Sequence, residues 1–395
     1  MTAASPGLAP VRGARRARPA RDLAIQAALI LAIGAALAFL SLTAYRHMVA
    51  RGIPLGFSFW NQPAGFAIDQ SLISYGPSST VGRAFLVGLI NTLIVSALAI
   101  AISVPLGFVV GAARLSPNWI VARVAAVWVE GLRNTPLLLQ LLFWYNAVLR
   151  QLPSARDSIA LWPGALLNQR GLYLPRPVPA GGFIFVAAAA IAGLFAALAI
   201  VARARRVDRD GRLATGAITY ALAALVAPPI VASALSGAPL TFDWPAPGGF
   251  NVSGGLHLFP EFVALLFGLS LYSSSYMAEV VRGGLQAVPK GQREAASALG
   301  LARRQTLLLV TGPQAMRAIL PPLTSQCVNV VKNSSLAVFI GYPDLVAVFP
   351  GSTIERTQAA VQVMAITLGV YLVLSVSTSA LIGLYDRRQM SRGGR

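Results

Sequence analysis

The chain has 395 residues, of which 56% are hydrophobic and only 11% are charged, and its formal net charge is +19. Several apolar runs approach the roughly 20 residues that cross a bilayer, so the composition excludes a soluble protein of two or three domains and predicts a helical membrane protein. The arginines stand mainly at the ends of these runs, which indicates membrane orientation and argues against a nucleic-acid partner.

The N-terminal part is predicted to hold a tail, a membrane helix and a loop. Residues 1–22 are rich in Ala, Pro and Arg, and we expect them to be disordered on the cytoplasmic side. Residues 23–45 are apolar over a longer stretch than the core of a signal peptide, so we interpret them as a first transmembrane helix. Residues 46–83 mix Gly, Pro, Ser and aromatic residues, which is typical of an external loop.

Two further spans are predicted next, at residues 84–113 and 119–149, with a short cytoplasmic turn between them. The later span contains the sequence Asn134–Pro136. A residue that precedes proline is pushed out of the α region of backbone space, so we expect a bend at that point.

The central part, residues 151–260, has two loops around two apolar runs. Residues 151–182 and 236–260 are polar and rich in Pro and Gly, so we expect both to be external. Residues 183–202 and 213–235 are candidates for a fourth and a fifth span, the latter broken at two prolines, with an arginine-rich inside segment between them. The alternative is that these two runs form a hairpin.

Three more apolar runs complete the chain at residues 261–284, 319–342 and 357–385. The sequence therefore predicts an all-α fold, a polytopic transmembrane helical bundle of about eight spans. Lys and Arg are concentrated on the side that holds both ends of the chain. We therefore expect the N- and C-termini in the cytoplasm.

The most specific motif is a charged stretch between apolar runs, EAASALGLARRQTLLLVTGPQAMRAILPP, at Glu294–Pro322. Residues 294–299 favour a helix that ends at Gly300 in the left-handed conformation. Residues 301–310 favour a second short helix, which we expect to stop near Gly312 and Pro313. A basic helix–glycine–helix element predicts a cytoplasmic docking surface, and the alternative is an amphipathic helix on lipid headgroups.

This stretch resembles the EAA loop of type I ABC importer permeases, whose pattern is E-A-A, three residues, G, nine residues, I-x-L-P. The matching positions are Glu294, Ala295, Ala296, Gly300, Val310 and Pro313. Gly312 stands where the family usually has leucine. The sequences RNTPLLLQLLFWY and VKNSSLAVFIGYPDL resemble the polar amino-acid branch, and the N-terminal and central additions resemble general L-amino-acid permease subunits.

The resemblance implies a type I (MetI-like) permease domain at residues 84–385, with a family core at 84–150 and 262–385 and an insertion at 151–260. It also implies import of L-amino acids across the bacterial inner membrane by alternating access. The implied partners are a cytoplasmic ABC ATPase that receives the EAA loop, a related or identical second permease subunit, a periplasmic amino-acid-binding protein and the lipid bilayer. Glu294 is expected near a helix N-terminus, where its charge is favourable.

No phosphate-binding G-x-x-x-x-G-K-[ST] motif occurs in the sequence, and its two histidines, His47 and His257, lie far apart. We therefore expect no catalytic site, cofactor or metal ion in this chain, with ATP and Mg bound by the partner ATPase. Two alternatives are an ion-coupled secondary amino-acid transporter, which would show inverted repeats, and a membrane scaffold or sensor that does not transport.

Polar residues in apolar segments are candidates for a gate or a substrate pathway, because charges in a membrane are costly. The candidates are Glu130, Arg133, Asn134, Pro136, Glu279, Lys332, Asn333 and Ser334. The charged residues Glu130, Arg133, Glu279 and Arg282 form either a gate network or structural ion pairs. The break at Asn134–Pro136 is either a pathway-lining broken helix or a packing kink. Lys332 either meets a substrate carboxylate, snorkels to the interface or pairs with Glu279.

Overall fold

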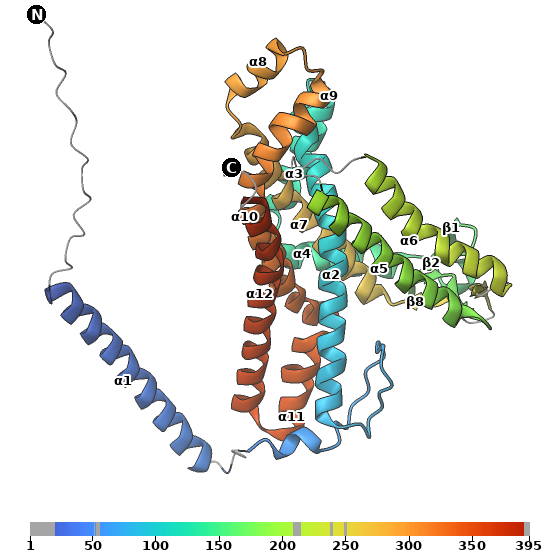
Figure 1. Ribbon diagram of the computed structural model, residues 1–395. Helices are drawn as coiled ribbons and strands as arrows, with labels where there is room; N and C mark the ends of the chain where they lie inside the picture. The colour runs from blue at the N-terminus through green and yellow to red at the C-terminus, as the bar shows by residue number, and fades with distance from the viewer. Residues whose placement is uncertain are drawn as a thin grey trace, which may run out of the picture.

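The computed structural model describes residues 20–50, 52, 56–207, 215–237, 240–248 and 251–390 (Figure 1). Residues 1–19 of the predicted tail lie outside the described residues. Residues 208–214, which hold the end of the arginine-rich segment at 203–212 and the start of the predicted fifth span, also lie outside them. The α-helices are α1 (Ala20–Ala50), α2 (Val81–Ala113), α3 (Trp119–Asn134), α4 (Leu137–Leu142), α5 (Phe183–Val207), α6 (Thr215–Ser236), α7 (Pro260–Gln286), α8 (Lys290–Ala298), α9 (Arg303–Thr306), α10 (Gly312–Asn333), α11 (Ile354–Thr357) and α12 (Ala360–Met390).

Shorter helical turns join these helices. The 3-10 turns are η1 (Ser58–Asn61), η3 (Leu149–Gln151), η4 (Ala155–Asp157) and η6 (Ser334–Ile340), and the π turns are η2 (Phe143–Val148), η5 (Leu307–Thr311) and η7 (Ala347–Thr353). The predicted helical bundle is confirmed.

Six helices in the described part of the chain are long and apolar enough to cross a membrane: Ala24–Ala50, Val81–Ala113, Phe183–Ala204, Thr219–Ser236, Pro260–Gln286 and Ala360–Ala380. The predicted spans at 119–149 and 319–342 are not among them. The first is divided between α3, α4 and η2, and the second combines the polar C-terminal half of α10 with η6. The number of eight spans therefore stays a prediction.

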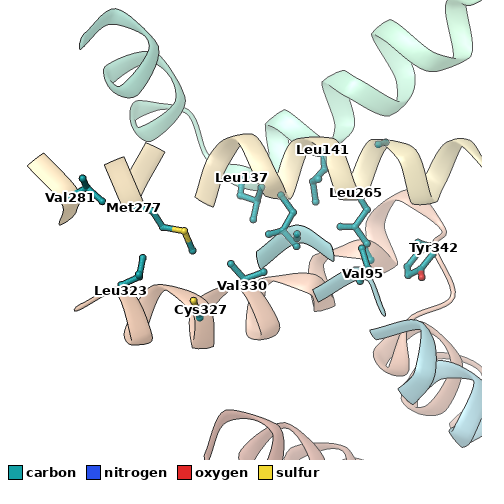
Figure 2. Close-up of a cluster of buried hydrophobic side chains, with 14 of the residues drawn as sticks. Val95, Leu137, Leu141, Leu265, Met277, Val281, Leu323, Cys327, Val330 and Tyr342 are labelled. Atoms are coloured by element: carbon teal, nitrogen blue, oxygen red, sulfur yellow. The ribbon is translucent and has the colours of Figure 1, made fainter. Parts of the chain in front are cut away.

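The core of the bundle forms where α7 lies between α2 and α10. Helix association within a bilayer depends on close packing, because lipid tails are as apolar as the side chains. Two glycines of α2 make this approach possible: a Cβ atom at Gly107 would lie 2.6 Å from the Cβ atom of Met277, and one at Gly111 would lie 2.6 Å from the carbonyl oxygen of Ala278. Figure 2 shows apolar side chains of α2, α4, α7 and α10 that gather around this contact.

The predicted bend is present between α3 and α4. Thr135 adopts an extended conformation with φ −103° and ψ 126°, and α4 begins directly after Pro136. The side-chain amide of Gln140 donates hydrogen bonds to the carbonyl oxygens of Leu132 (2.8 Å) and Thr135 (3.0 Å). These bonds satisfy main-chain acceptors that the break leaves without helical partners.

The predicted break at Pro228–Pro229 is wrong, because α6 continues through both prolines. Proline removes an N–H donor, but its fixed φ angle is close to the helical value, so the backbone need not leave the helix there. In Figure 1, α5 and α6 lie side by side as an antiparallel pair that leans away from the bundle. A Cβ atom at Gly193 of α5 would lie 2.5 Å from the carbonyl oxygen of Ala224 in α6.

The loops around this helix pair contain antiparallel strands that the sequence did not predict. They are β1 (Ile159–Trp162), β2 (Ala165–Asn168), β3 (Gly171–Leu174), β4 (Arg176–Pro179), β5 (Leu240–Asp243), β6 (Ala246–Pro247), β7 (Val252–Ser253) and β8 (Leu256–Leu258). One sheet has the order β1-β2-β3-β8, and β4-β5 and β6-β7 form two-stranded ribbons. These strands have two to four residues each and pair across up to 86 positions, as between Leu172 and Leu258, so periodicity gives no signal for them.

Candidate functional site

A projecting element formed by residues 287–311, here called the elbow, stands at one end of the bundle. Figure 1 shows its helices α8 and α9 at the end opposite α11. Helix α8 ends at Ala298, and Gly300, two residues further on, has a left-handed φ angle of +73°. The amide of Gly300 donates to the carbonyl oxygen of Ser297 (2.9 Å), and the amide of Leu301 donates to that of Ala296 (3.1 Å). This pair of hydrogen bonds forms the glycine-terminated helix end that the sequence predicts.

Two details of the elbow differ from the sequence-based expectation. Helix α8 begins at Lys290, so Glu294 lies in its second turn and not near its N-terminus. The second helix does not stop near Gly312 and Pro313, since η5 leads directly into α10, which begins at Gly312. Pro313 is tolerated there because the first turn of a helix needs no main-chain N–H donor.

Hydrogen bonds attach the elbow to the bundle at two points. The guanidinium of Arg293 donates to the carbonyl oxygen of Leu285 in α7 (2.9 Å), and the amide of Gln314 in α10 donates to the side-chain oxygen of Gln292 (3.1 Å). Leu299, next to the turn, is 79% exposed. The elbow is therefore an anchored element with an unburied apolar side chain at its turn.

The six residues of the EAA pattern differ in exposure. Glu294, Ala295, Gly300 and Pro313 are exposed, and Val310 is half-buried. Ala296 is buried, with only 3% of its surface exposed. The segments α8 and η5 pack against each other, so the elbow has an inner side and an outer side. Glu294 and Ala295 remain available for contact with another protein.

A second candidate region is an ion cluster in which the carboxylate of Glu279, in α7, faces three arginines. Arg114, at the end of α2, donates to its Oε2 atom. Arg282 donates from Nε to Oε1 at 3.1 Å. The Nη1 atom of Arg133, in the last turn of α3, lies 3.9 Å from Oε2, and its guanidinium lies over the ring of Tyr276 at 5.1 Å.

The cluster unites three of the predicted gate residues, Arg133, Glu279 and Arg282. Arg114 was missed, because the sequence places it in a cytoplasmic turn 165 positions from its partner. Glu130 is exposed on α3 and belongs to none of the ion pairs found among the described residues. Asn134 and Pro136 are exposed at the break beside Arg133.

A third candidate region is the face of α10 and α12 around Lys332. A groove of about 730 Å³ is lined by Lys332 and Ser375 and by apolar side chains that include Met364, Leu368 and Leu372. A second groove of about 610 Å³ shares the first two residues and is more polar. Its other polar lining residues are Thr324, Ser325, Asn329 and Ser379.

Lys332 stands where these two grooves meet. The predicted alternative of a Lys332–Glu279 pair is not observed in the described part of the chain, where Glu279 pairs with arginines. Ser334 is buried, and its hydroxyl donates to the carbonyl oxygen of Val331 (2.8 Å), whereas Asn333 is half-buried. Of the three candidates Lys332, Asn333 and Ser334, Lys332 is the one that lines the grooves.

A family model described as "Binding-protein-dependent transport system inner membrane component" matches residues 103–391. The chain belongs to this family. The permease is 46% identical over 342 residues to the putative amino-acid ABC transporter permease protein YhdX of Escherichia coli strain K12, with 86% of each chain covered. It is 44% identical to the general L-amino acid transport system permease protein AapQ of Rhizobium johnstonii, with 84% of this chain and 83% of the relative covered.

A third relative covers still more of the permease. The glutamate/glutamine/aspartate/asparagine transport system permease protein BztB of Rhodobacter capsulatus is 35% identical over 398 residues, and 93% of each chain is covered. The matches extend well beyond the EAA stretch. The resemblance to ABC importer permeases is thus confirmed, and the permease is a multi-pass inner-membrane transport subunit.

One buried acid of the permease was not singled out from the sequence. Asp344 lies between the last two predicted spans and is fully buried. Its carboxylate accepts hydrogen bonds from the amide of Ala347 (2.8 Å) and the hydroxyl of Tyr371 (3.3 Å). Burial raises the pKa of Asp344 to about 7. The signal available was an aspartate directly before an apolar helical run, a common N-cap position.

Proposed function

We propose that this permease imports L-amino acids across the inner membrane by alternating access, driven by a separate cytoplasmic ATPase that docks on the elbow. The observation that carries the proposal is the elbow itself, an exposed helical element that Gly300 terminates and that Arg293 ties to α7. The printed names of the curated relatives, amino-acid permeases that cover most of the chain, support the substrate class.

The elbow has the features that a mechanical coupling element requires. A force on α8 passes to α7 through a link of three residues, Ala287–Pro289, and through the hydrogen bond from Arg293 to Leu285. Because the link is short and the hydrogen bond spans it, a displacement of α8 is passed to α7 with little loss in the link. Movement of a docked ATPase would therefore tilt the helices behind the elbow, and binding of ATP would bias one conformation by as much as it favours that conformation.

The grooves at Lys332 offer a route for the substrate. An amino acid carries a carboxylate, for which a lysine ammonium is a suitable donor, and the neighbouring hydroxyl and amide groups can bind other polar atoms. The apolar groove on one side of Lys332 suits the aliphatic part of a substrate. The grooves open on the surface of a single chain, so a second permease subunit, related or identical, would close them.

The remaining features of the assembly follow from the elbow. With the elbow in the cytoplasm, α12 runs toward the cytoplasm, and both termini lie on that side. The opposite end then faces a periplasmic amino-acid-binding protein. In this proposal the permease itself binds no cofactor, and ATP and Mg are held by the ATPase.

The test is uptake of labelled amino acids by cells that lack the chromosomal copy and carry the permease or a variant. Glu294→Lys reverses an exposed charge on the elbow, and Gly300→Pro is incompatible with a φ angle of +73°. Both variants are expected to accumulate in the membrane yet lose uptake and co-purification of the ATPase. Gly291→Ala, on an exposed position of α8, is the matched control and should retain both.

The two alternatives give different results. An ion-coupled transporter would keep its uptake in both variants and lose it when the ion gradient is dissipated. A scaffold or sensor would show no uptake in any form of the protein. Either result would overturn the proposal.

A further inference from the structure

Three arginines from three segments share one carboxylate at Glu279, and they do not hold it equally. Arg114 and Arg282 make direct hydrogen bonds to it, whereas Arg133 stands at 3.9 Å, beyond hydrogen-bond distance. The guanidinium of Arg133 lies instead over the ring of Tyr276. Arg133 is therefore the loosely held member of the cluster.

The two members of the pair Glu279–Arg133 belong to different helices, α7 and α3. Glu279 lies seven residues before the end of α7, and the elbow begins directly after that end. Arg133 immediately precedes the break, since α3 ends at Asn134 and Thr135 is extended. The contact thus joins the helix that carries the elbow to the interruption in the α3–α4 span.

The arrangement allows the contact between Arg133 and Glu279 to form and break while the carboxylate stays bound to other arginines. Three guanidiniums surround one carboxylate, and of these Arg114 donates to Oε2 and Arg282 to Oε1. A carboxylate oxygen can accept more than one hydrogen bond, so a small approach of α3 to α7 would let Arg133 donate to Oε2 while the other two arginines stay bound. At the observed separation its guanidinium lies over Tyr276 in a cation–π contact.

We propose that Glu279 is a positioning residue that transmits elbow movement to the α3–α4 break, by making and releasing its contact with Arg133 while Arg114 and Arg282 stay bound. The inference rests on the proposed function, because it requires an ATPase that moves the elbow. It goes further by naming the pair that converts this movement into a change at Asn134–Pro136. The break then opens or closes toward the cytoplasm with the state of the ATPase.

A cysteine at the break can report this change. Cys327, the sole cysteine of the sequence, is buried, with only 3% of its surface exposed. An Asn134→Cys variant therefore places one accessible thiol beside Arg133. The complex is purified with its ATPase through a tag on the permease. The rate of maleimide labelling is then compared without nucleotide and with MgATP plus vanadate.

The parent N134C protein is expected to change its labelling rate with nucleotide on the order of tenfold. Arg133→Gln in the same background is expected to abolish that change and to lower uptake per ATP hydrolysed, while ATP hydrolysis persists. Arg176→Gln is the matched control, because it removes an ion pair to Asp243 (2.8 Å) on the β4–β5 ribbon, far along the chain from the elbow. It should behave like the parent.

The conservative variant Arg133→Lys keeps the positive charge, so it distinguishes loss of charge from misfolding. It also replaces Arg133→Gln if that variant does not accumulate. Retained charge should restore at least part of the nucleotide-dependent change. An equal change in the parent and in Arg133→Gln overturns the role of Glu279 but leaves the proposed function standing. Absence of any ATPase in the purified complex overturns the proposed function, and the inference with it.

Discussion

The guanidinium of Arg293, in α8, donates a hydrogen bond of 2.9 Å to the main-chain carbonyl oxygen of Leu285, in α7. The two residues flank the link at Ala287–Pro289, so the side chain bridges the joint between the membrane helix and the elbow. Leu285 is in the last turn of α7, where carbonyl oxygens lack helical partners and a cation is favourable. The hydrogen bond therefore stiffens the joint between α7 and α8.

Arg293→Met is expected to loosen this joint. The hydrogen bond is exposed, so its loss should cost stability only about 0.5–1 kcal/mol, but uptake per ATP hydrolysed should fall because part of the elbow displacement is absorbed at the link. The measurement is paired uptake and ATP hydrolysis in reconstituted vesicles. Arg304→Met, an exposed arginine on α9, is the control. Equal ratios in the two variants would contradict the prediction.

Gly291 within α8 and Gly300 just after its C-terminal end are expected to respond with opposite sign to alanine. At Gly300, with its φ angle of +73°, a Cβ atom is strained, so Gly300→Ala should destabilise by about 1 kcal/mol. Gly291 has helical geometry and open space around it, so Gly291→Ala should stabilise α8 by about 0.5–1 kcal/mol. Thermal unfolding of the purified proteins measures both. A gain at Gly300 would show that the left-handed turn is not required.

The α2–α7 contact is expected to reject even a methyl group. Gly111→Ala places a Cβ atom 2.6 Å from the main-chain oxygen of Ala278, which cannot rotate away, so the helices must separate at a cost of about 1–3 kcal/mol. Gly131→Ala on α3 meets nothing within 4 Å and serves as the control. The midpoint of thermal unfolding in detergent should fall for the first variant only.

Asp344 is expected to make stability depend on pH. Its pKa in the folded state is about 7, against an ordinary value of 3.8, because burial disfavours the charged form. Between these values the folded state holds a proton that the unfolded state releases. Stability from this group is therefore fully present below about pH 4 and is lost as pH rises toward 7, by at most about 1.4 kcal/mol per pH unit.

Asp344→Asn removes this proton and keeps the shape of the side chain. The variant should show a flatter dependence of its unfolding midpoint between pH 4 and pH 8, and near pH 8 it should be at least as stable as the parent. Asp243→Asn, in an exposed ion pair, is the control and should retain the parent slope. A parent slope that Asp344→Asn does not alter would assign the effect to other groups.

Lys332→Met is expected to reduce uptake by about tenfold or more, since the loss of a hydrogen bond to a charged group costs roughly 1.5–3 kcal/mol. Folding should be little affected, because Lys332 is exposed and lines open grooves. Met364→Leu, on the apolar wall of the same groove, is the control. Competition by amino acids against compounds that lack a carboxylate would show whether this group is what the lysine binds.

Features set by neighbouring residues could be predicted from the sequence. The helix end at Gly300 and the bend before Pro136 depend on backbone preferences within a few positions, and both are present. Long apolar runs likewise predicted α1, α2, α5, α6, α7 and α12 to within about five residues, but the runs at 119–149 and 319–342 did not match the bounds of α3 and α10. The break at Pro228–Pro229 was wrong, because proline disfavours a helix without forbidding it.

Features that depend on distant partners could not be predicted. Arg114 and Glu279 meet through the packing of α2 on α7, and no local pattern records that approach. The burial of Asp344 depends on α2 and α12 closing around a short connection, as the Asn91 hydrogen bond to the Pro343 carbonyl oxygen (2.9 Å) indicates. The charged residues were recognisable as candidates, but their partners were not.

The small sheet beside α7 has an evolutionary implication. Strands β3 and β8 are direct neighbours, and Leu174 stands opposite Leu256, so the whole excursion through α5 and α6 leaves and re-enters at one point of the fold. Two residues in such a pairing can be joined by a tight two-residue turn. The helix pair therefore belongs to an insertion that can be gained or lost without displacing the two strands that flank it.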